Sequence, residues 1–222
     1  MLAHIWSGRK TKNLNSGIKR KRIDYEDVDQ ADEYNSNDEE NFIHNIFTRD
    51  NHIYFSDNIT PTTAFLLNKE LRKLDIHLQK DAITSKRELI IYLHLTTTGG
   101  CISSAFSIID CMENLTVPVY TVIDGNVSSA GTLISIHGSK RYICKNSYIL
   151  IHELRSGFWG KMSYLEENYE NCKKIHNHII DMYTAKTKMT KQKIINLLKK
   201  DLELNAEEAI TIGLADEIYI GL

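Results

Sequence analysis

The spacing of apolar residues along this chain changes between a helix-like and a strand-like period. Thr60 followed by Pro61 is a good helix start, since threonine caps a helix and proline fits its first position. The apolar residues after it recur near helical spacing: Phe65, Leu67, Leu71 and Leu74. Residues 89–95 then form a nearly continuous apolar run, which is typical of a strand buried on both faces. The pattern therefore predicts a helix followed by a buried strand.

The strand ends in a turn, and the unit of strand, turn and helix then repeats. Residues 97–100 form the turn, and apolar positions over 105–112 predict a helix after it. A second strand is expected over 117–122, a second turn at 124–126 and a second helix over 129–137. Strands that alternate with helices indicate an α/β domain with mainly parallel strand pairing.

The rest of the chain predicts short strands around a long polar helix. In chain order we expect strands over 141–144 and 148–151, a polar helix over 163–186, a helix from Thr190 to Lys200, and a last strand over 216–220. Asn205 and Glu208 have the spacing of a capping box before a short helix that ends at Gly213.

The first forty residues differ from the rest because they hold few apolar residues. Residues 9–22 are basic and residues 24–40 are strongly acidic. Such a segment cannot bury a core, so we expect a charged, disordered arm over 1–40 and a folded domain over 41–222. The run KRKR at 19–22 has the composition of a nucleic-acid or nuclear-import patch, but a solvated tail neutralised by its own acidic half fits better.

Composition narrows the class of protein without identifying its chemistry. The 222 residues are 42% hydrophobic and 25% charged, as in a globular domain, and a net charge of −2 gives no drive toward nucleic acid or an anionic membrane. No apolar run could span a bilayer, and the amino terminus lacks the features of a signal peptide. The four cysteines form no CxxC pair, so we expect free thiols in a cytoplasmic or comparable reducing compartment, and no metal site.

Two glycine-containing turns carry the candidate chemistry, because ligands gather at the carboxyl ends of strands in α/β folds. Ser129 starts the second helix among small residues, where the helix dipole and free space favour a nucleophilic hydroxyl. The backbone amides of Ala130 and Gly100 are placed to hold a developing oxyanion. Taken alone, a serine at such a position is more often a helix cap than a nucleophile.

Two further residues complete the set that a serine nucleophile requires. His152 ends an apolar strand and starts a loop, a position that tends to face a cleft. Asp201 follows the helix that reaches Lys200 and precedes the next helix cap. In such a set the histidine accepts the serine proton and the carboxylate holds the histidine tautomer. The order serine, histidine, aspartate along the chain differs from the orders of chymotrypsin, subtilisin and the α/β-hydrolases.

Four blocks of the sequence resemble the ClpP family, the proteolytic subunits of the Clp protease. They are the apolar strand with its glycine turn at 93–100, the serine segment at 125–131, the strand pair ending in histidine at 141–152, and the carboxyl-terminal block at 201–216. The blocks occur in the order of the family, and the resemblance covers residues 42–222.

The resemblance assigns roles to the candidate residues. It implies the following set: Ser129 as nucleophile, His152 as general base, Asp201 as orienting carboxylate, and the backbone amides of Gly100 and Ala130 as oxyanion hole. Ser128 is the rival nucleophile, but the glycines that flank the segment align Ser129 with the family serine.

The resemblance also implies an architecture and partners. The fold would be the α/β, ClpP/crotonase-like fold of repeated β-β-α units, and the activity that of a serine endopeptidase on unfolded polypeptides. Two seven-membered rings of identical chains would stack through the long helix after His152 and the strand that feeds it. An AAA+ unfoldase of the ClpX or ClpA type would deliver substrates and bind the ATP. This chain contains no GxxxxGK[ST] phosphate loop, and we expect it to hold no cofactor.

Three departures from the family pattern affect the site and its surroundings. Thr97 and Thr98 stand where the family has Ser-Pro, which is expected to make the oxyanion turn less rigid, because proline fixes a backbone angle. Ala130 replaces the family's methionine and changes the substrate pocket. Phe158 and Trp159 make the loop before the long helix bulkier, which affects contacts between rings.

Three other functions compete with this interpretation. A catalytically weak or inactive ClpP-like subunit would act structurally in a mixed ring, although such relatives usually lack triad members. A crotonase-type enzyme would share the fold and hold an acyl-thioester through two amides, without needing the serine, histidine and aspartate together. A nucleic-acid binder would use residues 19–22, but the net charge is acidic and no aromatic residues are interleaved with the basic ones.

Overall fold

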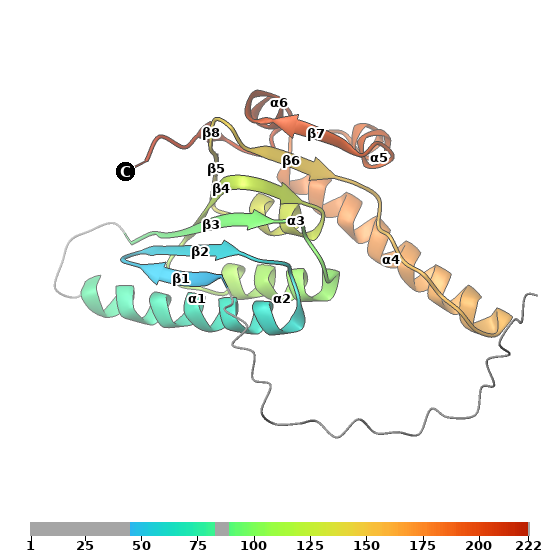
Figure 1. The fold of residues 1–222 in the computed structure, drawn as a ribbon, viewed down its shortest axis with the longest axis horizontal. Coiled ribbons are helices and arrows are strands. Elements are labelled where there is room, and N and C mark those ends of the chain that lie inside the picture. The colour runs from blue at the N-terminus through green and yellow to red at the C-terminus, as the bar shows by residue number, and fades with distance from the viewer. Residues whose placement is uncertain (1–44, 83–88, 222) are drawn as a thin grey trace, which may run out of the picture. The chain divides into compact units, whose positions relative to one another are not determined.

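The structure is a computed structural model that describes residues 45–82 and 89–221 (Figure 1). The charged arm expected over residues 1–40 lies outside the described residues. Within them, strands and helices alternate along most of the chain, and the predicted α/β fold class is confirmed.

Within the described residues, eight strands form one sheet. Its main path is β1 (Ile46–Arg49), β2 (His52–Ser56), β3 (Ile91–Thr97), β4 (Val119–Ser128), β5 (Lys140–Ile143) and β8 (Glu217–Ile218). Beside this path, β6 (Tyr148–Ile151) pairs with the end of β4, and β7 (Leu202–Asn205) pairs with β6. All pairings are parallel except β1 with β2 and β6 with β7, which confirms the expected mainly parallel sheet.

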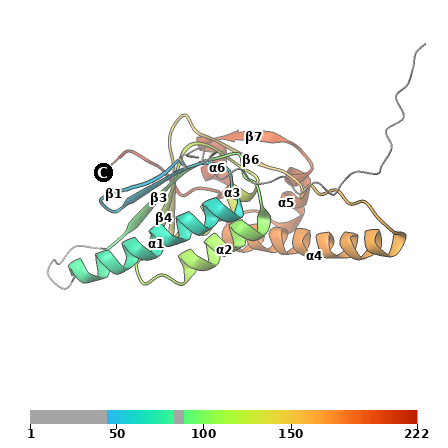
Figure 2. The same cartoon turned by 60° about the horizontal axis from the view of Figure 1, so that its bottom comes forward.

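Six helices accompany the sheet in the part of the chain that the structure describes. They are α1 (Pro61–Ala82), α2 (Ile102–Glu113), α3 (Ala130–Ile136), α4 (Met162–Lys186), α5 (Lys191–Leu198) and α6 (Ala206–Ile212). α1 and α2 lie side by side against one face of the sheet, and α4 extends away from it (Figure 1, Figure 2).

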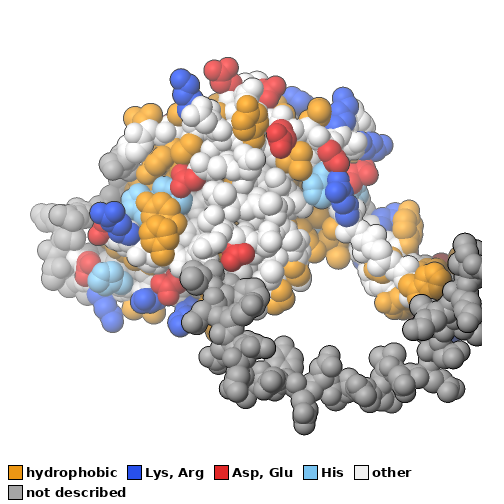
Figure 3. Space-filling model, viewed as in Figure 1, with side chains coloured by type: hydrophobic (Ala, Val, Ile, Leu, Met, Phe, Trp, Pro, Cys, Tyr) orange, Lys and Arg blue, Asp and Glu red, His pale blue; other side chains and the backbone are white. Residues whose placement is uncertain are grey.

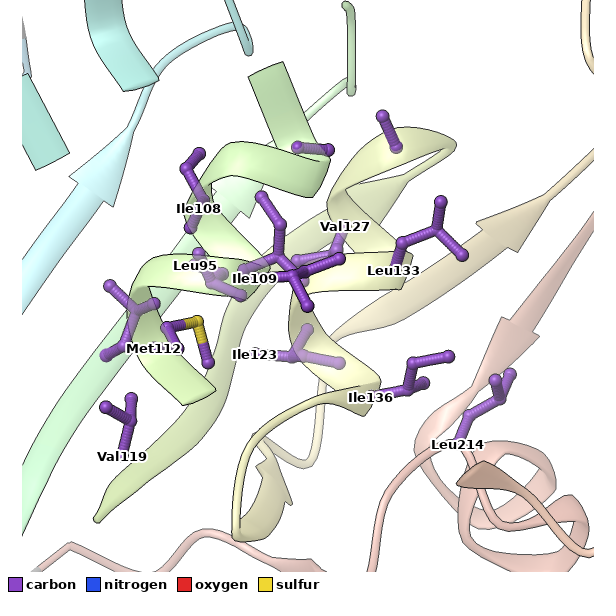
Figure 4. Packing of buried hydrophobic residues seen from close by; sticks show 14 of the residues in the cluster. Leu95, Ile108, Ile109, Met112, Val119, Ile123, Val127, Leu133, Ile136 and Leu214 are labelled. Atoms are coloured by element: carbon purple, nitrogen blue, oxygen red, sulfur yellow. The ribbon is translucent and has the colours of Figure 1, made fainter. Parts of the chain in front are cut away.

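The main core lies between the sheet and the helices α1, α2 and α3. Alternate residues of the central strands, such as Leu93, Leu95 and Ile123, point toward these helices and are buried. Ile108 of α2 and Leu133 of α3 belong to the same cluster (Figure 4). Each such side chain contributes about 1.5–3 kcal/mol when it leaves water. This layer therefore fixes the strand and helix ends that carry the candidate site.

Several helix ends form as the sequence predicts. α1 begins at Pro61, and the Thr60 hydroxyl accepts the Thr63 backbone N–H at 3.1 Å. The capping box before α6 is complete, with bonds of 2.9 and 3.0 Å between Asn205 and Glu208. A helix cap typically contributes about 1 kcal/mol, so these residues help to set where the helices start.

The turn predicted at residues 124–126 is wrong, because β4 runs through them. The first half of β4 pairs with β5 and its last residues pair with β6, so the strand changes partner at this point. A Cβ on Gly125 would come within 3.0 Å of the Thr96 hydroxyl oxygen. Glycine here permits close packing inside a strand, and the sequence pattern does not distinguish this from a turn.

The sequence pattern also misses the edges of the sheet. The hairpin of β1 and β2 is not predicted, and neither is β7, which lies between Asp201 and the helix that Asn205 caps. Both β1 and β7 are largely exposed, so they lack the apolar alternation that marks a strand. Residues 152–161, between β6 and α4, contain no strand, in keeping with the loop expected before the long helix.

The sheet face opposite α1 and α2 carries a polar cluster among aromatic rings. His94 is only 4% exposed; its Nδ1 lies 2.7 Å from Asp124 Oδ2 and its Nε2 lies 2.8 Å from His52 Nδ1. Tyr54 stacks on His94 and Tyr92 stacks on His52, with ring centroids 4.4 and 4.7 Å apart. The cluster therefore joins the strands β2, β3 and β4 through side chains as well as through the backbone ladder.

A group of large apolar side chains is exposed near the start of α4. Trp159 is 95% exposed, and Met162 and Tyr164 are exposed beside it in the sequence. Figure 3 shows hydrophobic side chains gathered at this outer end of α4. No helix within the described ranges is both long and apolar enough to cross a membrane. The four cysteines are free thiols, as expected.

Candidate active site

Ser129 lies in a strained turn between the end of β4 and the start of α3. Its φ of 55° and ψ of −126° are unusual for a residue with a side chain. Such conformations cost about 1–3 kcal/mol and cluster at functional sites. The turn is held on both sides, because the Ser129 N–H donates to the Leu150 carbonyl at 2.9 Å and the Ser129 carbonyl accepts the Thr132 N–H at 3.0 Å. This strand-to-helix turn is the type that exposes a nucleophilic side chain.

The hydroxyl of Ser129 does not cap the helix that follows it. No side-chain capping hydrogen bond forms at the amino terminus of α3, so the interpretation of this serine as a cap is wrong. Ser129 instead lines a cavity of about 190 Å³. The rival Ser128 belongs to β4 and is not among the residues that line the cavity. The geometry therefore favours Ser129 over Ser128 as the candidate nucleophile.

The neighbouring glycine turn approaches Ser129 very closely. Gly99 and Gly100 have φ values of 94° and 143°, in the region that favours glycine. A Cβ on Gly99 would lie 2.6 Å from the Ser129 Cβ, and a Cβ on Gly100 would lie 2.2 Å from the Ile59 carbonyl oxygen. Only glycine at both positions allows the two turns to meet, which brings the Gly100 backbone to the cavity.

Hydrogen bonds fasten the glycine turn in place of the missing proline. Thr97 Oγ1 accepts the Gly99 N–H at 3.0 Å, and Thr98 Oγ1 donates to Asn58 Oδ1 at 2.5 Å. The Gly99 carbonyl also accepts the Ile59 N–H at 2.8 Å. The loss of rigidity expected from the two threonines is therefore countered by the bonds that their hydroxyls make.

The cavity brings together four of the five candidate residues. Gly100, Ser129, Ala130 and His152 all line it. Apolar side chains form much of the remaining wall: Ile102, Leu133, Leu154 and Ile179. A volume of about 190 Å³ lies below the roughly 300–1,000 Å³ of pockets that hold whole drug-sized ligands. The cavity thus has the size and lining to receive one apolar side chain of a longer substrate.

His152 directly follows β6 and has the tautomer that a general base needs. Its Nδ1 lies 2.6 Å from the backbone carbonyl oxygen of Glu153. A carbonyl oxygen only accepts, so Nδ1 carries the proton and Nε2 is left with its lone pair. In a serine hydrolase the same tautomer accepts the hydroxyl proton at Nε2. The bond to Glu153 orients the ring but supplies no negative charge.

Asp201 is the candidate residue that the structure does not bring into the cavity. Its Oδ2 lies 2.5 Å from Arg155 Nη2, and both side chains are more than half exposed. The backbone nevertheless lies close to His152, because β6 and β7 are antiparallel and Ile151 is paired with Leu202. His152 and Asp201 are the residues that adjoin this last pair of the ladder. The two backbones are thus close together, while the carboxylate of Asp201 is bound to an arginine.

Three residues at the site are not singled out by the sequence. Arg155 lines the cavity and lies three residues after His152. This short spacing in the sequence could have indicated a positive charge near the candidate base. Thr132 Oγ1 donates to the Ser129 carbonyl at 2.6 Å, and its place one turn into the predicted helix is a usable signal. Tyr183 lines the cavity from α4, and no local pattern connects it with the serine.

Comparisons with known proteins identify the family of this chain. The family model described as Clp protease matches residues 35–221. The chain is also similar to a protein of Deinococcus radiodurans that is named ATP-dependent Clp protease proteolytic subunit. The two are 27% identical over 161 residues, which cover 72% of this chain and 76% of the relative. Since the family match spans most of the sequence, this chain belongs to the Clp protease family.

Proposed function

We propose that this chain is a serine endopeptidase in which Ser129 attacks the peptide carbonyl and His152 accepts its proton. The observation that carries the proposal is the shared cavity. A serine in a strained strand-to-helix turn lines it together with a histidine and the backbone of Gly100 and Ala130. Nucleophile, base and amide donors are the groups that acyl transfer from a peptide requires.

The reaction follows from the roles of these groups. Ser129 Oγ bonds to the carbonyl carbon, and its proton passes to His152 Nε2. The N–H groups of Gly100 and Ala130 stabilise the negative charge that develops on the carbonyl oxygen. His152 then gives its proton to the leaving amine, and a water molecule that His152 deprotonates releases the acyl group from Ser129. Loss of one oxyanion donor lowers kcat by about 10²–10³-fold in such enzymes.

Asp201 has the role of orienting His152 in this proposal. Its carboxylate must therefore leave Arg155 and hydrogen-bond to His152 instead. An exposed ion pair contributes only about 0–1 kcal/mol, and this pair is more than half exposed. The strand register supports the exchange, because Asp201 and His152 adjoin the last pair of β6 and β7, which is Ile151 with Leu202. Rotation of side chains, without movement of the strands, then completes the serine, histidine and aspartate set.

The proposal includes an assembly and partners. Identical chains form two stacked seven-membered rings that enclose the active sites, and the exposed Trp159, Met162 and Tyr164 support a contact surface near the start of α4. The substrates are unfolded polypeptides that an AAA+ unfoldase of the ClpX or ClpA type delivers. ATP is bound by that partner, in keeping with the ATP-dependent name of the relative, and this chain uses no cofactor.

Replacement of the nucleophile tests the proposal. In Ser129→Ala, hydrolysis of a fluorogenic peptide and phosphonylation by a fluorophosphonate are expected to fall to background, because no other hydroxyl takes the same place. Ser128→Ala is the matched control and keeps both activities. A fully assembled wild-type protein that shows neither activity would contradict the proposal.

One observation favours a second candidate, the inactive structural subunit of a mixed ring. Asp201 binds Arg155, and His152 Nδ1 binds the Glu153 carbonyl, so the aspartate does not orient the histidine in the single chain. The two candidates differ in the assembled protein: an endopeptidase is phosphonylated by the fluorophosphonate at Ser129, whereas a structural subunit is not. Mass spectrometry of the treated protein identifies the phosphonylated residue.

A further inference from the structure

Behind the candidate nucleophile lies a short chain of buried hydroxyl groups. Thr132 is 1% exposed and Tyr183 is 2% exposed. The Thr132 hydroxyl lies 2.6 Å from the Ser129 carbonyl oxygen and is also hydrogen-bonded to the Tyr183 hydroxyl. Thr132 belongs to α3 and Tyr183 to α4, so the chain of bonds connects the long helix to the strained turn.

The donors in this chain can be assigned from elementary chemistry. The Ser129 carbonyl oxygen only accepts, so the single hydroxyl proton of Thr132 points at it. The Tyr183 hydroxyl must then donate to Thr132 Oγ1. Burial raises the pKa of Tyr183, so the phenol keeps the proton that this bond needs. Each hydroxyl proton has one acceptor, and the direction runs from Tyr183 to Ser129.

The hydrogen bonds to the Ser129 carbonyl also fix the orientation of the next backbone amide, that of Ala130. The Ser129 carbonyl and the Ala130 N–H belong to one planar peptide unit and point in opposite directions. Thr132 donates to this carbonyl twice, from its N–H at 3.0 Å and from its hydroxyl at 2.6 Å. Ala130 is the first residue of α3, so its N–H has no acceptor within the helix. Fastening the carbonyl therefore sets the direction of an N–H that is free to bind an oxyanion.

We propose that Thr132 and Tyr183 are positioning residues that aim the Ala130 N–H at the substrate oxyanion. This inference rests on the proposed peptidase function and deepens it. The hydroxyl of Thr132 restrains the peptide plane, and the hydroxyl of Tyr183 keeps Thr132 in the rotamer that reaches the Ser129 carbonyl. A loosened plane leaves the nucleophile and the base in place but lowers the stabilisation of the transition state.

The test compares Thr132→Val, which removes the hydroxyl at nearly constant volume, with Thr132→Ser, which keeps it. In the assembled protein, Thr132→Val is expected to lower kcat about ten-fold and to change KM by less than about two-fold. Thr132→Ser retains kcat within about two-fold. Tyr183→Phe lowers kcat by about three-fold, because Thr132 keeps its own bond to the carbonyl.

A second readout separates positioning from stability. A peptide aldehyde forms an oxyanion with the serine, so its affinity is expected to fall in parallel with kcat in Thr132→Val, while the affinity for the product peptide stays unchanged. Thr132→Val also leaves the Tyr183 hydroxyl without its partner and lowers Tm by about 2–4 °C. The double variant with Tyr183→Phe removes both hydroxyls and recovers Tm, but kcat stays low.

The outcomes distinguish this inference from the proposed function. An active wild type whose Thr132→Val variant keeps its kcat and its affinity for the aldehyde overturns the inference alone. Recovery of kcat together with Tm in the double variant also overturns it, because the role of the hydroxyls would then be structural. A wild type without hydrolysis or phosphonylation overturns the proposed function, and the inference with it.

Discussion

Arg155 and His152 belong to one loop, and in the proposed site both compete for the carboxylate of Asp201. In the single chain the arginine holds it, with Nη2 and Oδ2 2.5 Å apart. An exposed pair of this kind contributes about 0–1 kcal/mol, which corresponds to a factor of up to about five in the population of the free carboxylate. In the proposed site, a small difference in free energy between the pairs that Asp201 forms with Arg155 and with His152 therefore decides whether the histidine is paired.

Substitution of Arg155 tests this competition. Arg155→Gln frees Asp201, so hydrolysis by the assembled protein is expected to rise about 2–5-fold at low salt. The difference from wild type should shrink at high salt, because salt already weakens the exposed pair. The measurement is kcat/KM for a fluorogenic peptide at two ionic strengths.

Two controls accompany the arginine substitution. Arg49→Gln removes another exposed arginine that pairs with an aspartate, far along the chain from the site, and leaves kcat/KM unchanged. Asp201→Asn in the Arg155→Gln background abolishes the gain. Lower activity in Arg155→Gln alone would show that the arginine supports catalysis rather than withholding the carboxylate.

At the scale of elements, the strands β2, β3 and β4 are joined through a histidine pair, of which His94 is buried and His52 is partly buried. Burial first, and the neighbouring His94 second, lower the pKa of His52, against the opposite effect of Asp50 and Asp124. Tyr54 stacks on the imidazole of His94, and Tyr92 stacks on that of His52. The Cys144 thiol donates to Oδ1 of Asp124, the carboxylate oxygen that His94 does not contact. Protonation of His52 is thus less favourable in the folded chain than in the unfolded one.

The lowered pKa predicts how stability depends on pH. The contribution of His52 is fully present above its unfolded pKa of about 6.5 and is lost as pH falls below it, because the unfolded chain then binds the proton more readily. Urea unfolding at pH 7.5 and pH 5.5, taken as values about one unit on either side of 6.5, should show a smaller loss of stability in His52→Gln than in wild type.

An exposed histidine supplies the control for this measurement. His77 of α1 lies at the surface, 3.4 Å from Asp81. His77→Gln is expected to keep the pH dependence of the wild type. An equal pH dependence in His52→Gln and wild type would mean that the pair does not act on stability through protonation.

Elements that bury a face could be predicted from the sequence, and elements at the sheet edge could not. The apolar run at 89–95 and the capped start at Thr60 mark β3 and α1 because burial and capping leave local signals. β1 and β7 expose most of their residues and therefore have no pattern of apolar residues that would mark a strand. Gly125 shows a third case, in which one residue type serves either a turn or close packing, and only the three-dimensional neighbour decides.

The candidate site divides in a similar way. Ser129 and His152 could be placed from their positions at strand ends, because strand ends of a parallel sheet meet at one edge. The partner of Asp201 could not, because it depends on the rotamers of Arg155 and of the aspartate itself. The buried bond between Thr132 and Tyr183 joins residues far apart in the chain and has no periodic signal.

At the scale of the whole molecule, the exposed group near the start of α4 is expected to act in assembly. Trp159 and Met162 are 95% and 69% exposed, which is costly for apolar side chains that meet only water. If the chains assemble into the proposed particles of about fourteen, the double variant Trp159→Ser/Met162→Ser is expected to convert them into single rings of about seven. Mass photometry of the full-length protein measures both species.

The control for assembly removes apolar surface elsewhere. Ile220 is 92% exposed near the carboxyl end, and Ile220→Ser should leave the particle size unchanged. The role of α4 in ring stacking would be refuted by a Trp159→Ser/Met162→Ser protein that keeps the wild-type mass distribution.

Gly99 and Ser129 touch so closely that neither of their two turns can change its backbone geometry without the other. Any side chain at position 99 would push against the Ser129 Cβ and the Ser128 carbonyl at once. Position 99 therefore has one residue available to it, glycine. A variant that lost this glycine would lose the geometry of its nucleophile in the same step, without any change to the serine.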